Sequence, residues 1–95
     1  MELAGNTFLV TGAASGLGAG VARALVAAGG RVLLADIDAA GGAALADELG
    51  KATQFVRTDV TAESEVERAI GAATDSFGPI AGVVQCAGIL GAARI

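Results

Sequence analysis

The stretch that decides the fold is TFLVTGAASGLG, residues 7–18, in which a short apolar run leads into a glycine-rich loop. The β-branched and aromatic residues that open it predict a buried strand, and residues 17–28 predict a helix of small side chains. Gly12, Gly16 and Gly18 stand at TGxxxGxG spacing, which suits a tight turn, close approach of a pyrophosphate and close packing of the helix. Because a helix start offers unpaired N–H groups and a positive dipole end, this stretch predicts a phosphate-binding loop.

The rest of the chain alternates between apolar runs and segments of helical periodicity. The runs that predict buried strands are RVLLA at 31–35, TQFVRT at 53–58 and IAGVVQC at 80–86. Helices are predicted between them, at 39–49 and from Thr61 to Phe77. The order βαβαβαβ implies right-handed crossovers and a parallel sheet. We therefore predict an α/β fold, the first half of a doubly wound Rossmann-like sheet with strand order 3-2-1-4.

Helix starts and inward faces can also be predicted. Asp38 is a candidate N-cap of the second helix, and Thr61 is a candidate N-cap of the third. The apolar residues expected to face the sheet are, in chain order, Val21, Leu25, Ala28, Ala44, Leu45, Leu49, Val66, Ala69, Ile70, Ala73 and Phe77.

The composition sets limits on the class of protein. The 95 residues are expected to form a single unit, 1–95, and the net charge of −4 with scattered cations argues against a nucleic-acid partner. One cysteine and no histidine leave no pair for an internal disulfide and no zinc spacing, so no metal site is expected. The sequence carries no secretory signal and no apolar run of about 20 residues, so we expect no membrane partner and a cytoplasmic location.

A carboxylate follows the glycine loop at the distance expected for a dinucleotide site. Asp36 ends the second predicted strand, 18 residues after Gly18, where it can accept hydrogen bonds from ribose hydroxyls. No arginine or lysine lies near Ala13 or Ile37 in the sequence, so NAD is favoured over NADP. The alternatives are a tight turn before a helix for the loop, and a solvated strand end for Asp36.

Together these motifs resemble a known family. TGAASGLG, Asp36, Asp59-Val60 after the third strand, and CAG at 86–88 look like the first half of a short-chain dehydrogenase/reductase. Within that family, VTGAASGLG, FVRTDVT and CAGI are most similar to the branch of 3-hydroxyacyl-CoA dehydrogenase type 2, also called 17β-hydroxysteroid dehydrogenase type 10.

The resemblance implies NAD(H) as cofactor and assigns a role to each matching position. The pyrophosphate would be lined by Gly12, Ser15, Gly16, Leu17 and Gly18. The adenosine half would be held by Asp36 at the ribose, Ile37 against the adenine, and Asp59 and Val60 at the adenine edge. The ribose next to the nicotinamide would lie over Cys86, Ala87 and Gly88. One departure stands beside that last group, because Gln85 replaces the first asparagine of the family's NNAG motif, and altered packing is expected there.

Two of these residues have simpler interpretations. Asp59 can cap the following helix instead of, or as well as, contacting a nucleotide. Cys86 can be imagined as a nucleophile, but the chain has no histidine to activate it, so a packed small residue beside the cofactor is favoured.

No catalytic residue is predicted. The resembled family uses a tyrosine in a YxxxK motif, a serine and an asparagine, whereas this chain has no tyrosine. Its only lysine is Lys51, and its serines Ser15, Ser64 and Ser76 do not match the family position. Without a positioned proton donor, acid/base catalysis has no agent in these residues.

Two functions remain open from the sequence. The chain is either the cofactor-binding half of an NAD-dependent oxidoreductase, or a short non-catalytic module that binds a nucleotide or a partner. The resemblance implies, for a full-length protein, a homo-oligomer acting on a small alcohol or carbonyl such as a 3-hydroxyacyl-CoA or a hydroxysteroid. The fragment interpretation also predicts that the fourth strand is left as an uncovered apolar edge.

Overall fold

The computed structural model describes residues 3–86 of the chain. Their elements, in chain order, are β1 (Thr7–Thr11), α1 (Gly16–Ala27), β2 (Arg31–Asp36), α2 (Ala39–Leu49), a 3₁₀ turn (Gly50–Ala52), β3 (Thr53–Arg57), α3 (Glu63–Phe77) and β4 (Ile80–Gln85). Every predicted strand and helix is present, with boundaries within two residues of the prediction.

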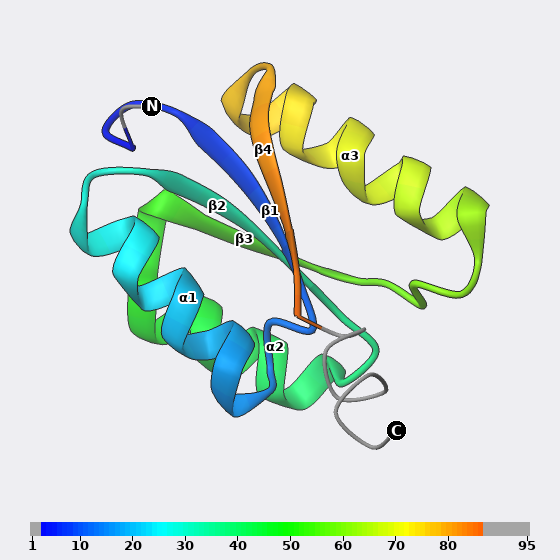
Figure 1. Cartoon of the computed structure of the whole chain (residues 1–95). Helices are drawn as coiled ribbons and strands as arrows, with labels where there is room; N and C mark the ends of the chain where they lie inside the picture. Colours follow the sequence, from blue (N-terminus) through cyan, green and yellow to red (C-terminus); the bar gives the residue numbers. More distant parts are fainter. Residues whose placement is uncertain (1–2, 87–95) are drawn as a thin grey trace.

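The four strands form one parallel sheet in the order β3-β2-β1-β4. Helices α1 and α2 cover one face of this sheet and α3 covers the other (Figure 1). The predicted order 3-2-1-4 is therefore confirmed. Since all strands run in the same direction, the segments that follow β1, β2 and β3 meet at one edge of the sheet.

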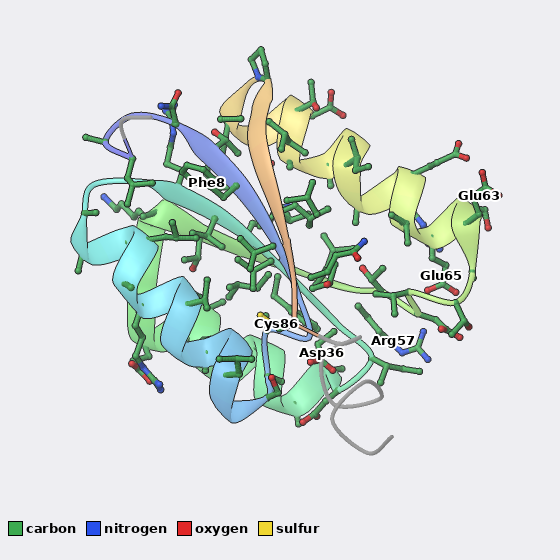
Figure 2. The ribbon with its side chains drawn as sticks, viewed as in Figure 1. Phe8, Asp36, Arg57, Glu63, Glu65 and Cys86 are labelled. Carbon is green, nitrogen blue, oxygen red and sulfur yellow. The ribbon has the colours of Figure 1, made fainter. Side chains whose placement is uncertain are left out.

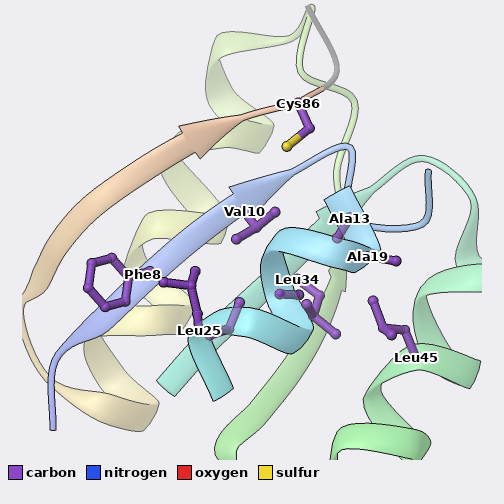
Figure 3. Packing of buried hydrophobic residues seen from close by; sticks show 10 residues of the cluster. Phe8, Val10, Ala13, Ala19, Leu25, Leu34, Leu45 and Cys86 are labelled. Atoms are coloured by element: carbon purple, nitrogen blue, oxygen red, sulfur yellow. The ribbon is translucent and has the colours of Figure 1, made fainter. Parts of the chain in front are cut away.

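Each face of the sheet has its own apolar core. The core under α1 and α2 includes Phe8, Val10, Leu25, Leu34 and Leu45 (Figure 3). The core under α3 consists of the buried residues Leu9, Leu33, Ala35, Ala69 and Ala73. Small residues allow the helices to lie close: a Cβ added at Gly42 on α2 would lie 2.0 Å from the ring of Phe55.

The helix faces differ in part from the prediction. Ala28, Ala44 and Ile70 are exposed, and Val21 is only half-buried. On α1 the buried positions are instead Gly18, Ala19, Ala22 and Leu25. Alanine and glycine share the inward face with Leu25 and Leu45, so large apolar side chains alone do not mark that face.

The start of α3 also corrects the prediction. Asp38 caps α2 as expected, its side chain accepting a hydrogen bond from the N–H of Gly41. Thr61 does not cap α3, which begins at Glu63 after Ala62 with no side-chain cap. The physical reason is that α3 begins one residue later than predicted, so the N-cap position falls on Ala62, whose side chain has no oxygen to accept an N–H. The Thr61 hydroxyl belongs to the preceding turn, where it donates to Asp59 Oδ1 at 2.6 Å.

Strand β4 is half-exposed, where the sequence predicted a buried strand. It lies at one edge of the sheet, and Ala81, Val83 and Gln85 are exposed on the face that α3 covers elsewhere. Val83 is 50% exposed, whereas Val84, on the other face, packs against the core of α1. Among the described strands none pairs with the outer side of β4, so the predicted uncovered apolar edge is confirmed for this part of the chain.

Candidate functional site

A cavity of about 390 Å³ lies at the edge of the sheet where β1, β2 and β3 end. Its lining comes from the three segments that follow these strands: Gly12, Ala14, Ser15, Asp36, Ile37, Asp38, Thr58, Asp59 and Val60. Figure 2 shows Asp36 at this edge, with Phe8 at the other end of the sheet. The structure thus brings together six of the predicted cofactor-binding residues: Gly12, Ser15, Asp36, Ile37, Asp59 and Val60.

The glycine-rich loop is closed by the side chain of Ser15. Its hydroxyl donates to the carbonyl of Gly12 at 2.6 Å and accepts from the N–H of Gly18 at 3.0 Å, which makes it the N-cap of α1. Gly12 adopts a φ of 68°, a left-handed conformation that favours glycine. These two hydrogen bonds join the start of the loop to the first turn of α1, so Ser15 holds the shape of the loop.

Gly18 fixes how closely the helix approaches the loop. A Cβ added there would lie 2.0 Å from the carbonyl oxygen of Gly12 and 2.9 Å from the Cα of Ala13. Both neighbours are backbone atoms that cannot rotate away. The third glycine of the motif is therefore required by packing, as the spacing predicted.

Asp36 connects the end of β2 to the glycine-rich loop. Its Oδ2 accepts from the N–H of Ala14 at 3.0 Å, and its Oδ1 accepts from the N–H of Asp38 at 2.8 Å. The side chain is half-buried, so it faces the cavity while it holds both segments. Each carboxylate oxygen retains acceptor capacity beyond these single bonds.

Asp59 is held in a compact turn between β3 and α3. Its Oδ1 accepts both the hydroxyl and the N–H of Thr61, and its own N–H donates to Glu65 Oε1 at 2.8 Å. The Thr61 hydroxyl, the Thr61 N–H and the charge of Arg57 lower the pKa of Asp59. The carboxylate therefore stays ionised, and it caps this turn instead of α3.

The other predicted site residues lie outside the cavity lining. Gly16 and Leu17 open α1 on the exposed side, with Leu17 50% exposed, and Gly18 is buried behind the loop. Cys86 is buried at the end of β4, where its N–H donates to the carbonyl of Thr11 at 3.0 Å (Figure 3). Ala87 and Gly88 fall outside the described residues.

The environment of Cys86 indicates a packed thiol. Burial raises the pKa of this thiol, which favours its neutral form. It belongs to the apolar core that includes Val10 and Ala13. A nucleophilic cysteine needs the opposite environment, one that lowers the pKa.

Three lining residues were not predicted as site residues. Ala14 contributes the N–H that Asp36 accepts, and Thr58 follows β3 with its hydroxyl bonded to the carbonyl of Val56. Asp38 was identified only as a helix cap. The signal that points to Asp38 is its place two residues after Asp36, on the segment that leaves the same strand end.

Of the serines and the lysine considered for catalysis, only Ser15 lines this cavity, and its hydroxyl caps α1. The hydroxyl of Ser76 bonds to the side chain of Gln54 near the start of β3, and Ser64 and Lys51 are exposed outside the lining. Within residues 3–86, no helix is long and apolar enough to span a membrane.

The chain is similar to dehydrogenases in sequence. The short chain dehydrogenase family matches residues 6–95. Over 80 residues the chain is 46% identical to 3-hydroxyacyl-CoA dehydrogenase type-2 of Drosophila melanogaster, an alignment that covers 84% of this chain and 31% of that protein. It is also 46% identical over 85 residues to L-fucose dehydrogenase of Oryctolagus cuniculus, covering 90% of this chain and 30% of that one.

Solved structures agree in fold. The 3-ketoacyl-(acyl-carrier-protein) reductase of Brucella melitensis, complexed with NADH, superimposes with a TM-score of 0.83 at 37% identity, covering 85% of this chain and 34% of that one. A short chain dehydrogenase/reductase of Burkholderia phymatum in complex with NAD gives 0.84 at 32% identity, covering 87% and 31%. The chain spans about a third of the length of these proteins. Since the family match extends over nearly the whole sequence, the chain belongs to the short chain dehydrogenase family.

Proposed function

We propose that this chain is the NAD(H)-binding part of an oxidoreductase that transfers a hydride between NAD and an alcohol or carbonyl. One observation carries the proposal: three sequence-distant segments, after β1, β2 and β3, converge on one cavity with a glycine-rich loop and the carboxylate of Asp36. The relatives named above and the NAD-bound and NADH-bound structures support it.

The residues present fit a dinucleotide. The loop has no side chain at Gly12 or Gly16, and α1 begins at the loop, so backbone can approach a pyrophosphate. The N–H groups of Gly16 and Leu17 open α1 and have no preceding helical turn to accept them, so they suit phosphate oxygens. Ser15 and Gly18 would then act by holding this geometry.

The adenosine half fits the opposite side of the cavity. Asp36 would accept hydrogen bonds from the ribose hydroxyls, using acceptor capacity left after its bonds to Ala14 and Asp38. Ile37 and Val60 line the same cavity and are 57% and 41% exposed, so they offer apolar surface to the adenine. Asp59 would meet the adenine edge, while Cys86, Ala87 and Gly88 would lie toward the nicotinamide ribose.

The chemistry divides between cofactor and protein. When bound, the nicotinamide supplies or accepts the hydride. These 95 residues bind and orient it, but they contain no tyrosine or histidine to exchange a proton with the substrate. We therefore propose that this chain alone does not convert substrate. We also propose that the active protein acts on a 3-hydroxyacyl-CoA, a hydroxysteroid or a similar small alcohol, and that it is a homo-oligomer in the cytoplasm.

The test is NADH binding by the 95-residue chain, measured by the rise in NADH fluorescence. Asp36→Ala should weaken binding about tenfold or more, because it removes charged hydrogen bonds to the ribose, and it should relax discrimination against NADPH. Asp47→Ala is the matched control, since Asp47 is exposed on α2 outside the cavity lining. If Asp36→Ala binds NADH as tightly as the wild type does, and NADPH as tightly as the wild type does, the assignment is refuted.

A turnover assay separates this proposal from a non-catalytic binding module. The purified chain, mixed with NAD and alcohol or hydroxyacyl substrates, should produce no NADH. A protein that carries this sequence together with an acid/base tyrosine should produce it. If NADH forms with the 95-residue chain alone, the chemistry lies in residues other than those proposed here.

A further inference from the structure

We infer that Asp38 is a second specificity-determining residue of the nucleotide site, whose charge disfavours a nucleotide with a 2′-phosphate. The inference rests on the proposed function and adds a residue to it. Asp38 was predicted as the N-cap of α2, and the structure confirms that role. The same side chain also lines the cavity, beside Asp36 and Ile37.

The position of Asp38 is fixed by two hydrogen bonds. Its backbone N–H donates to Asp36 Oδ1 at 2.8 Å, and its own Oδ1 accepts from the N–H of Gly41 at 3.0 Å. Gly41 leaves room for the second oxygen, since a Cβ there would lie 2.5 Å from Asp38 Oδ2. The carboxylate of Asp38 is therefore held at the start of α2, on the segment whose backbone bonds to Asp36.

The charged residues that line the cavity are all acidic, so a second carboxylate adds to its negative charge. Asp36, Asp38 and Asp59 all line it, and no cation does. Arg57 lies in register opposite Asp36 on the neighbouring strand, so a cation stands near the cavity that sequence proximity did not indicate. Within residues 3–86, Arg57 forms no ion pair. Two carboxylates from one segment, Asp36 and Asp38, thus line the cavity, whereas Arg57 is not among the lining residues.

The two carboxylates are expected to act by different means. Asp36 accepts hydrogen bonds from the ribose and also carries a charge, so its removal weakens a nucleotide without 2′-phosphate and relaxes discrimination against one that carries it. Asp38 acts through its charge alone, so its removal should leave a nucleotide without 2′-phosphate almost unaffected and improve binding of one that carries it. A Coulomb effect over several ångströms near a protein surface corresponds to a roughly three- to tenfold change in affinity and declines with salt.

The experiment compares two nucleotides that differ only at the 2′ position, adenosine 5′-monophosphate and adenosine 2′,5′-bisphosphate. Titration calorimetry with the 95-residue chain gives the ratio of their dissociation constants. Asp38→Asn removes the charge and keeps the capping oxygen, so α2 stays capped. The ratio should shift toward the bisphosphate about three- to tenfold in 20 mM salt, and by less than twofold in 500 mM salt.

Asp47→Asn is the matched control, because it removes the same charge from an exposed position of the same helix outside the cavity. Asp38→Ser, which also caps, should reproduce the effect of Asp38→Asn if charge is the cause. An unchanged ratio in Asp38→Asn, or an equal change in Asp47→Asn, overturns the inference while leaving the proposed function intact. A wild-type chain that binds neither NADH nor adenosine monophosphate overturns the proposed function and this inference together.

Discussion

The end of the site near β2 and β3 and the end near β4 are built differently. At the first end, carboxylates that follow separate strands fix the segments around a cavity: Asp36 accepts from the N–H of Ala14 in the glycine-rich loop, and Asp59 accepts from Thr61 in its own turn. At the second end, Cys86 is buried in the apolar core, and the exposed side of β4 carries Ala81, Val83 and Gln85. The polar side chains that line the cavity therefore lie at the end near β2 and β3, and apolar packing dominates the end near β4.

The largest expected effect comes from Gly18→Ala, which would disrupt the contact between α1 and the glycine-rich loop. The added Cβ would lie 2.0 Å from the carbonyl oxygen of Gly12, so either the loop or α1 must move. We expect a loss of about 3 kcal/mol in the free energy of unfolding, as in severe overpacking, and loss of detectable NADH binding. Urea denaturation and NADH fluorescence measure the two effects.

Gly20→Ala provides the control for that prediction. A Cβ at Gly20, in the same helix, would meet nothing within 4 Å. Replacing glycine by alanine inside a helix should then stabilise the protein by about 0.5–1 kcal/mol. If Gly18→Ala proves as stable as Gly20→Ala and still binds NADH, the close contact between loop and helix does not shape the site.

The sequence predicted the strands, the helices and the strand order because apolar runs, glycines at helix ends and βα alternation are local signals. It could not predict that Asp36 clamps the loop at Ala14, since that bond joins residues 22 positions apart and depends on the β1–β2 register. It misplaced the cap at Thr61 because the chain forms a turn at Asp59–Thr61 before α3 begins, so the N-cap position falls on Ala62. It placed Ala44 inside because alanine suits both a helix surface and a core.

In the site, too, local sequence patterns were predictive and contacts between distant segments were not. Spacing alone predicted Asp36 and the glycines, because a dinucleotide imposes a fixed separation between loop and ribose. Asp38 lines the cavity because of the turn after β2, and Arg57 lies opposite Asp36 because of the β2–β3 register. Neither position could be predicted from sequence spacing. A residue that already has one clear role, such as a cap, gives no second signal in a single sequence.

A smaller effect is expected when the turn at Asp59 is loosened by Thr61→Val. The variant removes the hydroxyl that does most to lower the pKa of Asp59, so this pKa should rise toward its usual value of 3.8. Because the folded pKa is lowered, the turn stabilises the protein above the ordinary pKa and loses this contribution as pH falls through the folded value. Carboxyl NMR titration measures the pKa, and melting temperatures at pH 6 and pH 2.5 measure the stability.

The wild-type chain and Thr61→Val should differ in melting temperature at pH 6, and the difference should become smaller at pH 2.5. Thr74→Val is the control, because its hydroxyl bonds only to the carbonyl of Ile70 within α3. An Asp59 pKa that is the same with and without the Thr61 hydroxyl would show that this end of the site is not held by the turn.

The smallest effect is expected at the β4 end and only in alkaline solution. Burial raises the pKa of Cys86 above its usual value of 9.0, so the folded state holds the thiol proton more tightly than the unfolded state. This contribution to stability is complete below about pH 9 and is lost as pH rises through the folded pKa. The melting temperature of the wild type should therefore fall more steeply than that of Cys86→Ala between pH 8.5 and pH 10.5. In this range the chain has no tyrosine to titrate, and besides Cys86 only Lys51 and the amino terminus titrate.

Cys86→Ala should bind NADH within about twofold of wild type, because the thiol packs behind the site and donates no hydrogen bond to it. A large loss of NADH affinity in this variant would mean that the β4 end recognises the nucleotide as directly as the end near Asp36 does.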